Sequence, residues 1–368
     1  MRLKYMLTIA IMCMAVFLIA CGNNEEEISV VQDSGTEVTI TAEDSDKNLA
    51  VLATTPMLGE FVKKVAGENI EVQVLMPYAV DPHHFEPSPQ DVKKINEADL
   101  VFYVGLQYET ASLRKLLENS VESGQVLIEI GSKVNPIEFG NDDHDDHDKH
   151  DDHDDKDKHD DEDKHDDHDD KDKHDDEDKH DDHDDKDKHD DHDHGVFDPH
   201  FWFDPNRVAL AVGAIKNELI NIDPENKNDY ESSANNYLDK LKALDGQIAT
   251  LIETIPSDNR KIITTHESLG YLENRYGVEV LVTIIPSVTT EDGVTPKQLV
   301  KVIEEIKEHE IKALFLESES PTKSAEIIAA ETNINLVSGL WVETLKINQS
   351  YIDFLKTNVD LIVENLKD

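Results

Sequence analysis

A run of 53 residues in the middle of the chain, 142–194, contains only aspartate, glutamate, lysine and histidine. We expect this tract to be disordered, because it has no apolar side chain whose burial could offset the loss of chain entropy on folding. Its 15-residue unit at 149–163 repeats at 164–178, but a solenoid needs a repeated apolar core and the unit has none. Any folded body must therefore be built from the segments on either side.

The same tract contains 13 of the 18 histidines of the chain. Neutral imidazole is the commonest metal ligand in proteins, and short His-rich tracts are typical of metal binding. A solvating spacer of aspartate and lysine would gain nothing from these histidines. We therefore interpret the tract as a set of weak, interchangeable metal sites, formed by His144, His147, His150, His153, His159, His165, His168, His174, His180, His183, His189, His192 and His194.

Charge and cysteine content exclude several classes of protein. The chain has 81 acidic residues against 35 lysines and arginines, and such an excess is repelled by a phosphate backbone, so no nucleic-acid partner is expected. The two cysteines, Cys13 and Cys21, both lie near the N-terminus, which excludes a thiolate zinc site or a redox pair in the body. A metal site in the body must use histidines and carboxylates.

The first 21 residues have the features of a lipoprotein signal peptide. Arg2 and Lys4 precede an apolar run over 6–20, which is shorter than the roughly 20 residues that span a bilayer. The run ends in Leu-Ile-Ala-Cys, similar to a lipobox, with Cys21 as the lipidated residue; the alternative is an ordinary signal peptide with an incidental cysteine. Residues 22–47 are polar and acidic, typical of a flexible tether. We expect an exported protein that is lipid-anchored to the outer face of the bacterial cell membrane.

Outside these segments, the apolar pattern predicts strands that alternate with helices, which is typical of parallel α/β layers. Four strands are expected before the tract and four after it, at 49–53, 71–75, 100–104, 126–130, 261–265, 278–284, 313–317 and 335–337. Two helices are expected between the sets, at 205–222 and about 225–255. The second has a continuous apolar stripe and a length of roughly 45 Å.

This pattern predicts an α/β protein of two lobes with parallel sheets, joined by a long rigid helix. The N-terminal lobe is expected over 48–205, interrupted by the tract, and the C-terminal lobe over 259–368. Residues 206–258 would form the linking helices.

Two copies of Asp-Pro-His followed by aromatic residues occur at 81–85 and 198–202, outside the repeat unit. Proline fixes its own φ and restricts the residue before it, so each copy holds a histidine on a stiff turn. One such histidine alone would be a loop residue, but two copies, each after a predicted strand, indicate His83 and His200 as metal ligands. His266, at the end of the strand KIITTH, is a third candidate, although by itself it could cap a helix predicted from Glu267.

In open parallel sheets, ligands bind beyond the carboxyl ends of the strands, so facing lobes would bring these histidines together at an interlobe metal site. A zinc ion that is bound but not catalytic takes a fourth protein ligand. Glu343 follows the last predicted strand, while Glu317 and Glu319 follow the strand before it, and all three compete for this place.

Three segments and the His-rich insert resemble the metal-binding lipoproteins of ABC importers for zinc and manganese. The segments are DPHHFEPSPQDVKKINEADLVFYVG (81–105), DPHFWFDP (198–205) and TTHESLGYLENRYGV (264–278). The resemblance runs from about residue 48 to the end, and it implies two lobes bridged by a long helix with one ion bound between them. Carried over position by position, it implies the ligands His83, His200, His266 and Glu343.

The resemblance implies capture of Zn²⁺ and its delivery to the permease and ATPase of an importer by a monomeric protein that is not an enzyme. Manganese-type members have a glutamate where this chain has His266, and three imidazoles with one carboxylate suit zinc better than manganese. A closed site of four protein ligands also leaves no position for the activated water that a zinc hydrolase needs. The alternatives are a manganese-type solute-binding lipoprotein, a surface adhesin, a metallohydrolase, or a metal buffer that acts through 142–194. A water as the fourth ligand in place of Glu343 is also open.

Three further expectations concern the working of the site. His84 should point away from the ion that His83 binds, because adjacent side chains on an extended segment face opposite ways. The long helix should limit hinge bending, so that the ion is released by local movement of a ligand-bearing loop. Metal affinity should fall steeply below about pH 6.5, since histidine must lose its proton to bind a metal.

Overall fold

The computed structural model describes residues 49–121, 125–139, 197–320 and 323–368. The expected signal peptide, Cys21, the tether and the His-rich tract lie outside these ranges, so the expectations for them stay predictions. Within these ranges, no helix is long and apolar enough to cross a membrane.

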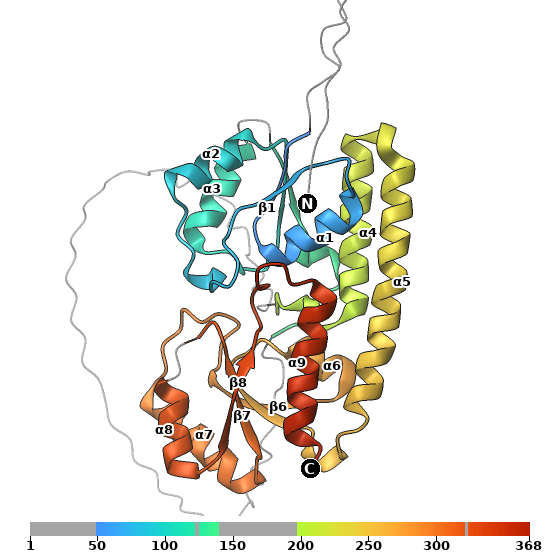
Figure 1. Ribbon diagram of the computed structural model, residues 1–368. Helices are drawn as coiled ribbons and strands as arrows, with labels where there is room; N and C mark the ends of the chain where they lie inside the picture. The colour runs from blue at the N-terminus through green and yellow to red at the C-terminus, as the bar shows by residue number, and fades with distance from the viewer. Residues whose placement is uncertain (1–48, 122–124, 140–196, 321–322) are drawn as a thin grey trace, which may run out of the picture. The chain divides into compact units, whose positions relative to one another are not determined.

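The first lobe, in which Figure 1 labels β1, is built on a four-stranded sheet with the strand order β2-β1-β3-β4 and parallel pairing throughout. Its elements are β1 (Val51–Ala53), α1 (Pro56–Ala66), β2 (Val72–Val74), η1 (Pro82–His84), α2 (Pro89–Glu97), β3 (Leu100–Tyr103), α3 (Ala111–Val121), β4 (Val126–Glu129) and η2 (Gly131–Lys133). The central strand β1 is buried over its whole length, as expected for a parallel sheet that is covered on both faces.

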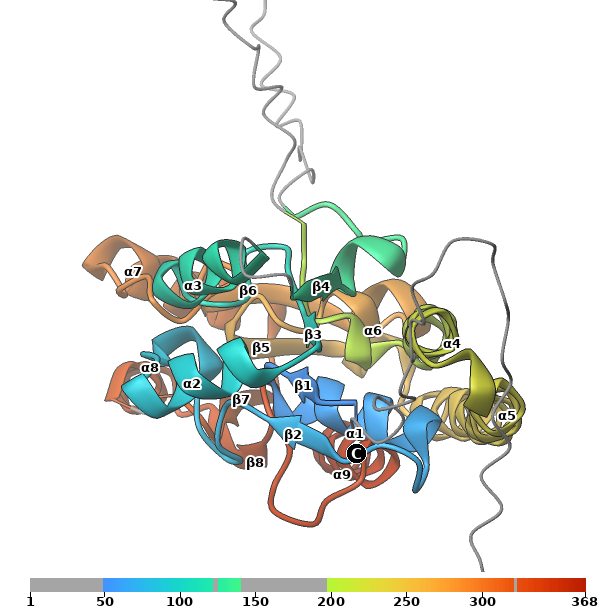
Figure 2. The same ribbon diagram turned by 90° about the horizontal axis from the view of Figure 1, so that it is seen from above.

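The second lobe repeats this topology in the order β6-β5-β7-β8, again with parallel pairing (Figure 2). Its elements are β5 (Lys261–His266), α6 (Gly270–Tyr276), β6 (Glu279–Ile285), α7 (Pro296–His309), β7 (Ala313–Glu317), α8 (Lys323–Thr332), β8 (Asn335–Leu340) and α9 (Tyr351–Leu366). In each lobe, the first strand in the chain pairs with the second on one side and the third on the other.

Two helices that lie side by side link the lobes: α4 (Pro205–Ile222) and α5 (Lys227–Ile252) (Figure 1). The short helices η3 (Phe201–Phe203), η4 (Pro224–Asn226) and η5 (Ser257–Asn259) flank them. At 26 residues α5 is about 39 Å long, and it contacts α1 of the first lobe and α9 of the second. The structure thus confirms the predicted fold, two parallel α/β lobes joined by a long helix.

One hydrophobic core is shared by both lobes and the linking helices. It includes Phe61 of α1, Tyr237 and Leu244 of α5, and Phe354 of α9, while smaller apolar clusters cover the other face of each sheet. A wide hinge rotation would divide this shared core and expose apolar surface, which is unfavourable. The packing therefore supports the expectation that the lobes move little relative to each other.

The last strand is longer than the sequence analysis predicts. β8 was expected to end at Val337 but continues to Leu340, and the register between β7 and β8 shifts so that Glu317 pairs with Leu340. Gly339 lies in this irregularity with a φ of 104°, a conformation open to glycine. Gly339 therefore lets the strand continue beyond Val337 through this irregularity.

Glu138 and Phe197 form an isolated antiparallel bridge, and Asp198 donates its N–H to the carbonyl of Ile137 at 3.0 Å. The chain therefore leaves the described lobe and returns to it at neighbouring points. Because the two ends meet, the length of the segment between them places little demand on the fold.

Helix starts follow the capping chemistry of the sequence. Thr55, Ser88, Asp204, Thr295 and Ser350 each accept a hydrogen bond from a backbone N–H in the first turn of the helix that follows. Proline occupies the first helical position after four of them, where its missing N–H costs nothing.

Replacement of Ser350 by alanine is expected to lower the free energy of unfolding by about 1 kcal/mol, the usual effect of losing an N-cap. The Ser350 hydroxyl accepts the N–H of Asp353 at 3.1 Å at the start of α9. Denaturant unfolding of S350A measures the free energy of unfolding, and S350N, which keeps a capping side chain, is the comparison. An equal loss in both variants would argue against the capping role.

Candidate metal centre

The structure brings together the four residues His83, His200, His266 and Glu343. One potential ligand atom from each lies within 4.8 Å of the others, and all four side chains are buried. His83 and His200 come from segments before the linking helices, and His266 and Glu343 from segments after them. The group thus forms from four distant points of the chain, each at a turn or a strand end.

Each Asp-Pro-His turn is held by its aspartate. Asp81 Oδ1 accepts the N–H of His83 at 2.9 Å, and Asp198 Oδ1 accepts the N–H of His200 at 2.8 Å. This bond from an aspartate to the backbone two residues on is the Asx turn. The proline of this motif predicts a stiff turn, and the repeated aspartate is a second signal in the sequence for the same turn.

His266 is the last residue of β5, and it does not cap a helix. The helix expected from Glu267 begins instead at Gly270, because residues 267–269 form a turn in which the N–H of Ser268 bonds to the carbonyl of His266. This turn keeps the imidazole at the end of the strand, in the buried group.

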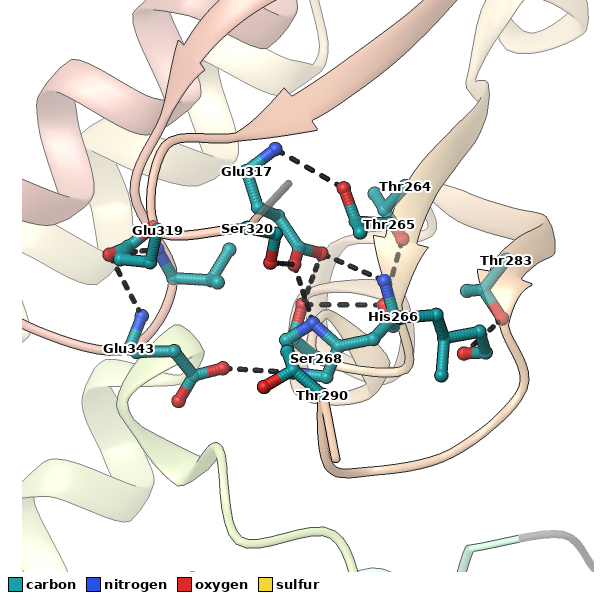
Figure 3. A network of polar contacts seen from close by, with 12 residues as sticks. Thr264, Thr265, His266, Ser268, Thr283, Thr290, Glu317, Glu319, Ser320 and Glu343 are labelled. Carbon is teal, nitrogen blue, oxygen red and sulfur yellow. Dashed lines mark hydrogen bonds and ion pairs between the residues drawn. The ribbon is translucent and has the colours of Figure 1, made fainter. Parts of the chain in front are cut away.

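Glu317 and Glu319, the two competitors for the fourth position, lie outside the group of four and support it (Figure 3). Glu317 ends β7, the neighbour of β5, and its Oε2 is 2.5 Å from Nδ1 of His266. Glu319 Oε1 accepts the backbone N–H groups of Val342 and Glu343, each at 3.3 Å. One carboxylate therefore orients an imidazole, and the other holds the loop that carries Glu343.

Three imidazoles converge on the carboxylate of Glu343. Its oxygens lie 3.5 Å from Nε2 of His83, 3.2 Å from Nε2 of His200 and 2.8 Å from Nε2 of His266. Nε2 of His83, Nε2 of His266 and Oε2 of Glu343 are nevertheless buried without a well-aligned hydrogen bond to any residue in the described part of the chain. Buried polar atoms without partners are rare in proteins, and a bound cation would satisfy all three.

Two of the imidazoles have carboxylate partners on their second ring nitrogen. Nδ1 of His200 is 2.8 Å from Asp198, and Nδ1 of His266 is paired with Glu317. Such pairs orient an imidazole and direct its Nε2 toward a metal. Among the described residues, the ring of His83 has no such carboxylate partner on Nδ1, and its one ion-pair contact is with Glu343.

The charges of the group shift its pKa values strongly. Burial disfavours the protonated form of His200, but the charges and hydrogen bonds of Glu343 and Asp198 outweigh it and raise the pKa to about 9. Burial likewise opposes protonation of His266, yet Glu317 and Glu343 raise its pKa well above the usual value. Burial would raise the pKa of Glu343, but the neighbouring imidazoles hold it well below its usual range. The carboxylate is therefore ionised, and a metal ion competes with protons for His200 and His266.

Burial, together with the charge of Glu343, raises the pKa of Glu319 to about 8. Glu319 is then mostly protonated at neutral pH, which limits the negative charge next to the four-residue group.

Aromatic side chains wall the group off from solvent. The hydroxyl of Tyr108 donates to the carbonyl of Glu343 at 2.9 Å, and Nε1 of Trp202 donates to the carbonyl of Val342 at 2.8 Å. Both rings are buried, whereas His84, beside His83, is exposed and outside the group. Tyr108 follows a strand without a motif around it, so the sequence offered no signal for its role.

Two parallel α/β lobes joined by a long helix, with three imidazoles and a carboxylate buried between them, define a two-lobed solute-binding protein with a site suited to a metal ion. The chain belongs to the family described as zinc-uptake complex component A, periplasmic (ZnuA), whose model matches residues 51–365. This is a family of solute-binding transport proteins and not of enzymes. The resemblance seen in the sequence is thereby confirmed.

Similar proteins carry names with different metals. The manganese ABC transporter substrate-binding lipoprotein PsaA of Streptococcus pneumoniae is 26% identical over 96% of this chain and 95% of its own length. The metal ABC transporter substrate-binding lipoprotein FimA of Streptococcus parasanguinis is 28% identical over 86% of this chain and 89% of its own.

Among solved structures, the periplasmic zinc-binding protein TroA of Treponema pallidum superposes with a TM-score of 0.69 at 19% identity, over 88% of this chain and 100% of that one. Fe(III)-bound YtgA of Chlamydia trachomatis has a TM-score of 0.66 at 21% identity, over 86% of this chain and 98% of that one. These likenesses establish the fold, and the choice of ion depends on the residues of the site.

Proposed function

We propose that this protein is an extracytoplasmic lipoprotein that captures Zn²⁺ and delivers it to an ABC importer. The observation that carries the proposal is the buried group of three imidazoles and one carboxylate, with three polar atoms that a cation would satisfy. In this proposal His83, His200, His266 and Glu343 are the four ligands, and the ion is cargo.

Zinc is favoured over manganese by the donor set. Three nitrogen donors and one oxygen donor suit a borderline ion such as Zn²⁺, whereas Mn²⁺ is better served by oxygen. The four protein side chains also match the tetrahedral number of ligands that zinc takes in closed sites. Relatives named for manganese make this a question for direct measurement.

Membrane attachment and partners follow from the same proposal. Relatives named as ABC transporter substrate-binding lipoproteins support a lipid anchor, which we place at Cys21, and a permease and an ATPase as partners. Residues 22–47 would tether a monomeric body to the membrane, and the 142–194 tract would add weak zinc sites beside the main one.

The test is calorimetric titration of the chain from residue 22, stripped of metal, with Zn²⁺ and with Mn²⁺, alongside a variant that lacks 142–194. We expect one tight zinc site in both proteins, weaker manganese binding, and additional weak zinc sites only where the tract is present. If the variant without 142–194 has no tight site, the tract itself binds the zinc, as in a metal buffer. Manganese binding as tight as zinc binding would favour a manganese-type importer.

Replacement of Glu317 by glutamine is expected to weaken zinc binding by about 10–100-fold, the usual effect of removing a carboxylate that orients a histidine ligand. Glu317 contacts both the backbone N–H and Nδ1 of His266. Competition with a chromophoric chelator measures the affinity. E326Q, on the distant helix α8, is the matched control, and an equal effect of both changes would contradict the role of Glu317.

A further inference from the structure

A buried hydrogen bond joins the two lobes next to the metal centre. The hydroxyl of Thr290, in the loop between β6 and α7, donates to Asp81 Oδ2 at 2.7 Å across a sequence separation of 209 residues. Both side chains are largely buried, with 8% and 9% of their surfaces exposed. This is a specific contact between the second lobe and the turn that carries His83.

The same carboxylate fixes that turn. Asp81 uses its other oxygen, Oδ1, to accept the N–H of His83 at 2.9 Å. The hydroxyl of Thr290, the carboxylate of Asp81 and the backbone of His83 therefore form one chain of hydrogen bonds. A charged acceptor shared by two donors is a strong link, so loss of one donor weakens the hold on the turn.

This link matters more for His83 than any single contact does for His200 or His266. The rings of His200 and His266 are each held by a carboxylate on Nδ1, and the ring of His83 has no such partner among the described residues. The two residues that precede Asp81 are exposed, with Val80 44% exposed and Ala79 at a φ of 58°, a conformation that is uncommon for alanine. A second contact between this loop and the other lobe, from the N–H of Ala79 to the carbonyl of Leu345 at 3.2 Å, involves only main-chain atoms.

We infer that Thr290 is a positioning residue: its hydrogen bond to Asp81 holds the turn that carries His83 against the second lobe, and this sets how fast the ion is released. We call this pair of hydrogen bonds, from Thr290 to Asp81 and from the His83 N–H to Asp81, the latch. The inference rests on the proposed function, in which His83 is a ligand. Opening of the latch frees the least supported ligand while the shared core stays intact, so the ion leaves by movement of one loop.

The test compares T290V with T290S and T289V in the full chain. Valine keeps the branched shape of threonine without the hydroxyl, and serine keeps the hydroxyl. Within the described part of the chain, the hydroxyl of Thr289 bonds only inside its own loop, where it accepts the N–H of Glu291, so T289V is the matched control. Zinc dissociation into excess chelator is followed by tryptophan fluorescence, to which Trp202 beside His200 contributes, and deuterium uptake over 77–85 is measured in the metal-free protein.

We expect T290V to release zinc about tenfold faster with a nearly unchanged association rate, as for loss of one hydrogen bond to a charged group. Its uptake over 77–85 should increase, while T290S and T289V behave as the unmodified protein. Equal uptake over 77–85 in T290V and the unmodified protein would overturn the latch, whether or not the chain binds zinc tightly. An unchanged rate of zinc release from T290V would also overturn the latch, but it would not contradict the proposed zinc site. Absence of tight zinc binding in the unmodified chain would overturn the proposed function and, with it, the role of the latch in release.

Discussion

Replacement of His200 by alanine is expected to weaken zinc binding by more than about 100-fold. Loss of a residue that merely orients a ligand already costs about 10–100-fold, and the loss of a ligand must cost more. His200 is fully buried, with Nε2 3.2 Å from Oε1 of Glu343 and Nδ1 2.8 Å from Oδ1 of Asp198. Its removal therefore also leaves Asp198 without its imidazole partner. Calorimetry with zinc measures the change directly.

The matched control for this prediction is H84A. His84 is exposed beside His83 and lies outside the buried group, so its removal should leave the zinc affinity unchanged. The ring of Trp202 lies 5.5 Å from that of His200, which makes its fluorescence a local report of zinc binding. Zinc binding by H200A as tight as that of H84A would remove His200 from the ligand set.

The fold and the two Asp-Pro-His histidines, His83 and His200, could be predicted because their signals are local, whereas only the family resemblance singled out Glu343 from Glu317 and Glu319. Strands that alternate with helices, a long apolar stripe and two Asp-Pro-His turns are each read from a few neighbouring residues. The strand-end rule then explains why distant turns should meet, since the carboxyl ends of parallel strands face the same side of a sheet.

The roles of the supporting residues could not be predicted, because they depend on which strands pair and in which register. Glu317 and Glu319 are equally good candidates for a ligand in the sequence, and only the pairing of β7 with β5 directs Glu317 to His266. Thr290 lies 209 residues from its partner Asp81, with no motif around it. Local sequence thus indicates what each side chain can do, and tertiary structure decides which partner it meets.

The shared core and the sparse support of His83 together indicate where the molecule can move. Tyr237 and Leu244 of α5 are part of one apolar cluster that extends into both lobes. Opening the lobes would break that cluster, whereas displacement of the His83 turn breaks a few hydrogen bonds. The less costly motion is therefore the local one, which is the mode of release expected from the long helix.

Zinc affinity is expected to keep rising with pH from about 6.5 to about 9, by about one to two powers of ten per pH unit. In the metal-free protein the pKa of His200 is raised to about 9 and that of His266 lies well above its usual value. Both imidazoles then carry protons at neutral pH, and zinc must displace them. Since a raised pKa moves proton loss to higher pH, affinity should not level off near pH 6.5, as unshifted histidines would predict.

Calorimetry at pH 7.5 in two buffers of different ionisation enthalpy measures the protons released on zinc binding, and we expect between about one and two per ion. E317Q serves as the comparison, because Glu317 is the largest cause that raises the pKa of His266, so its removal should reduce the number of protons released. A zinc affinity that is constant above pH 7, with no proton release, would mean that the two imidazoles are already neutral. The carboxylates around them, Asp198, Glu317 and Glu343, would then serve mainly to orient the rings, and their charge would not set the pH range in which the protein gives up its ion.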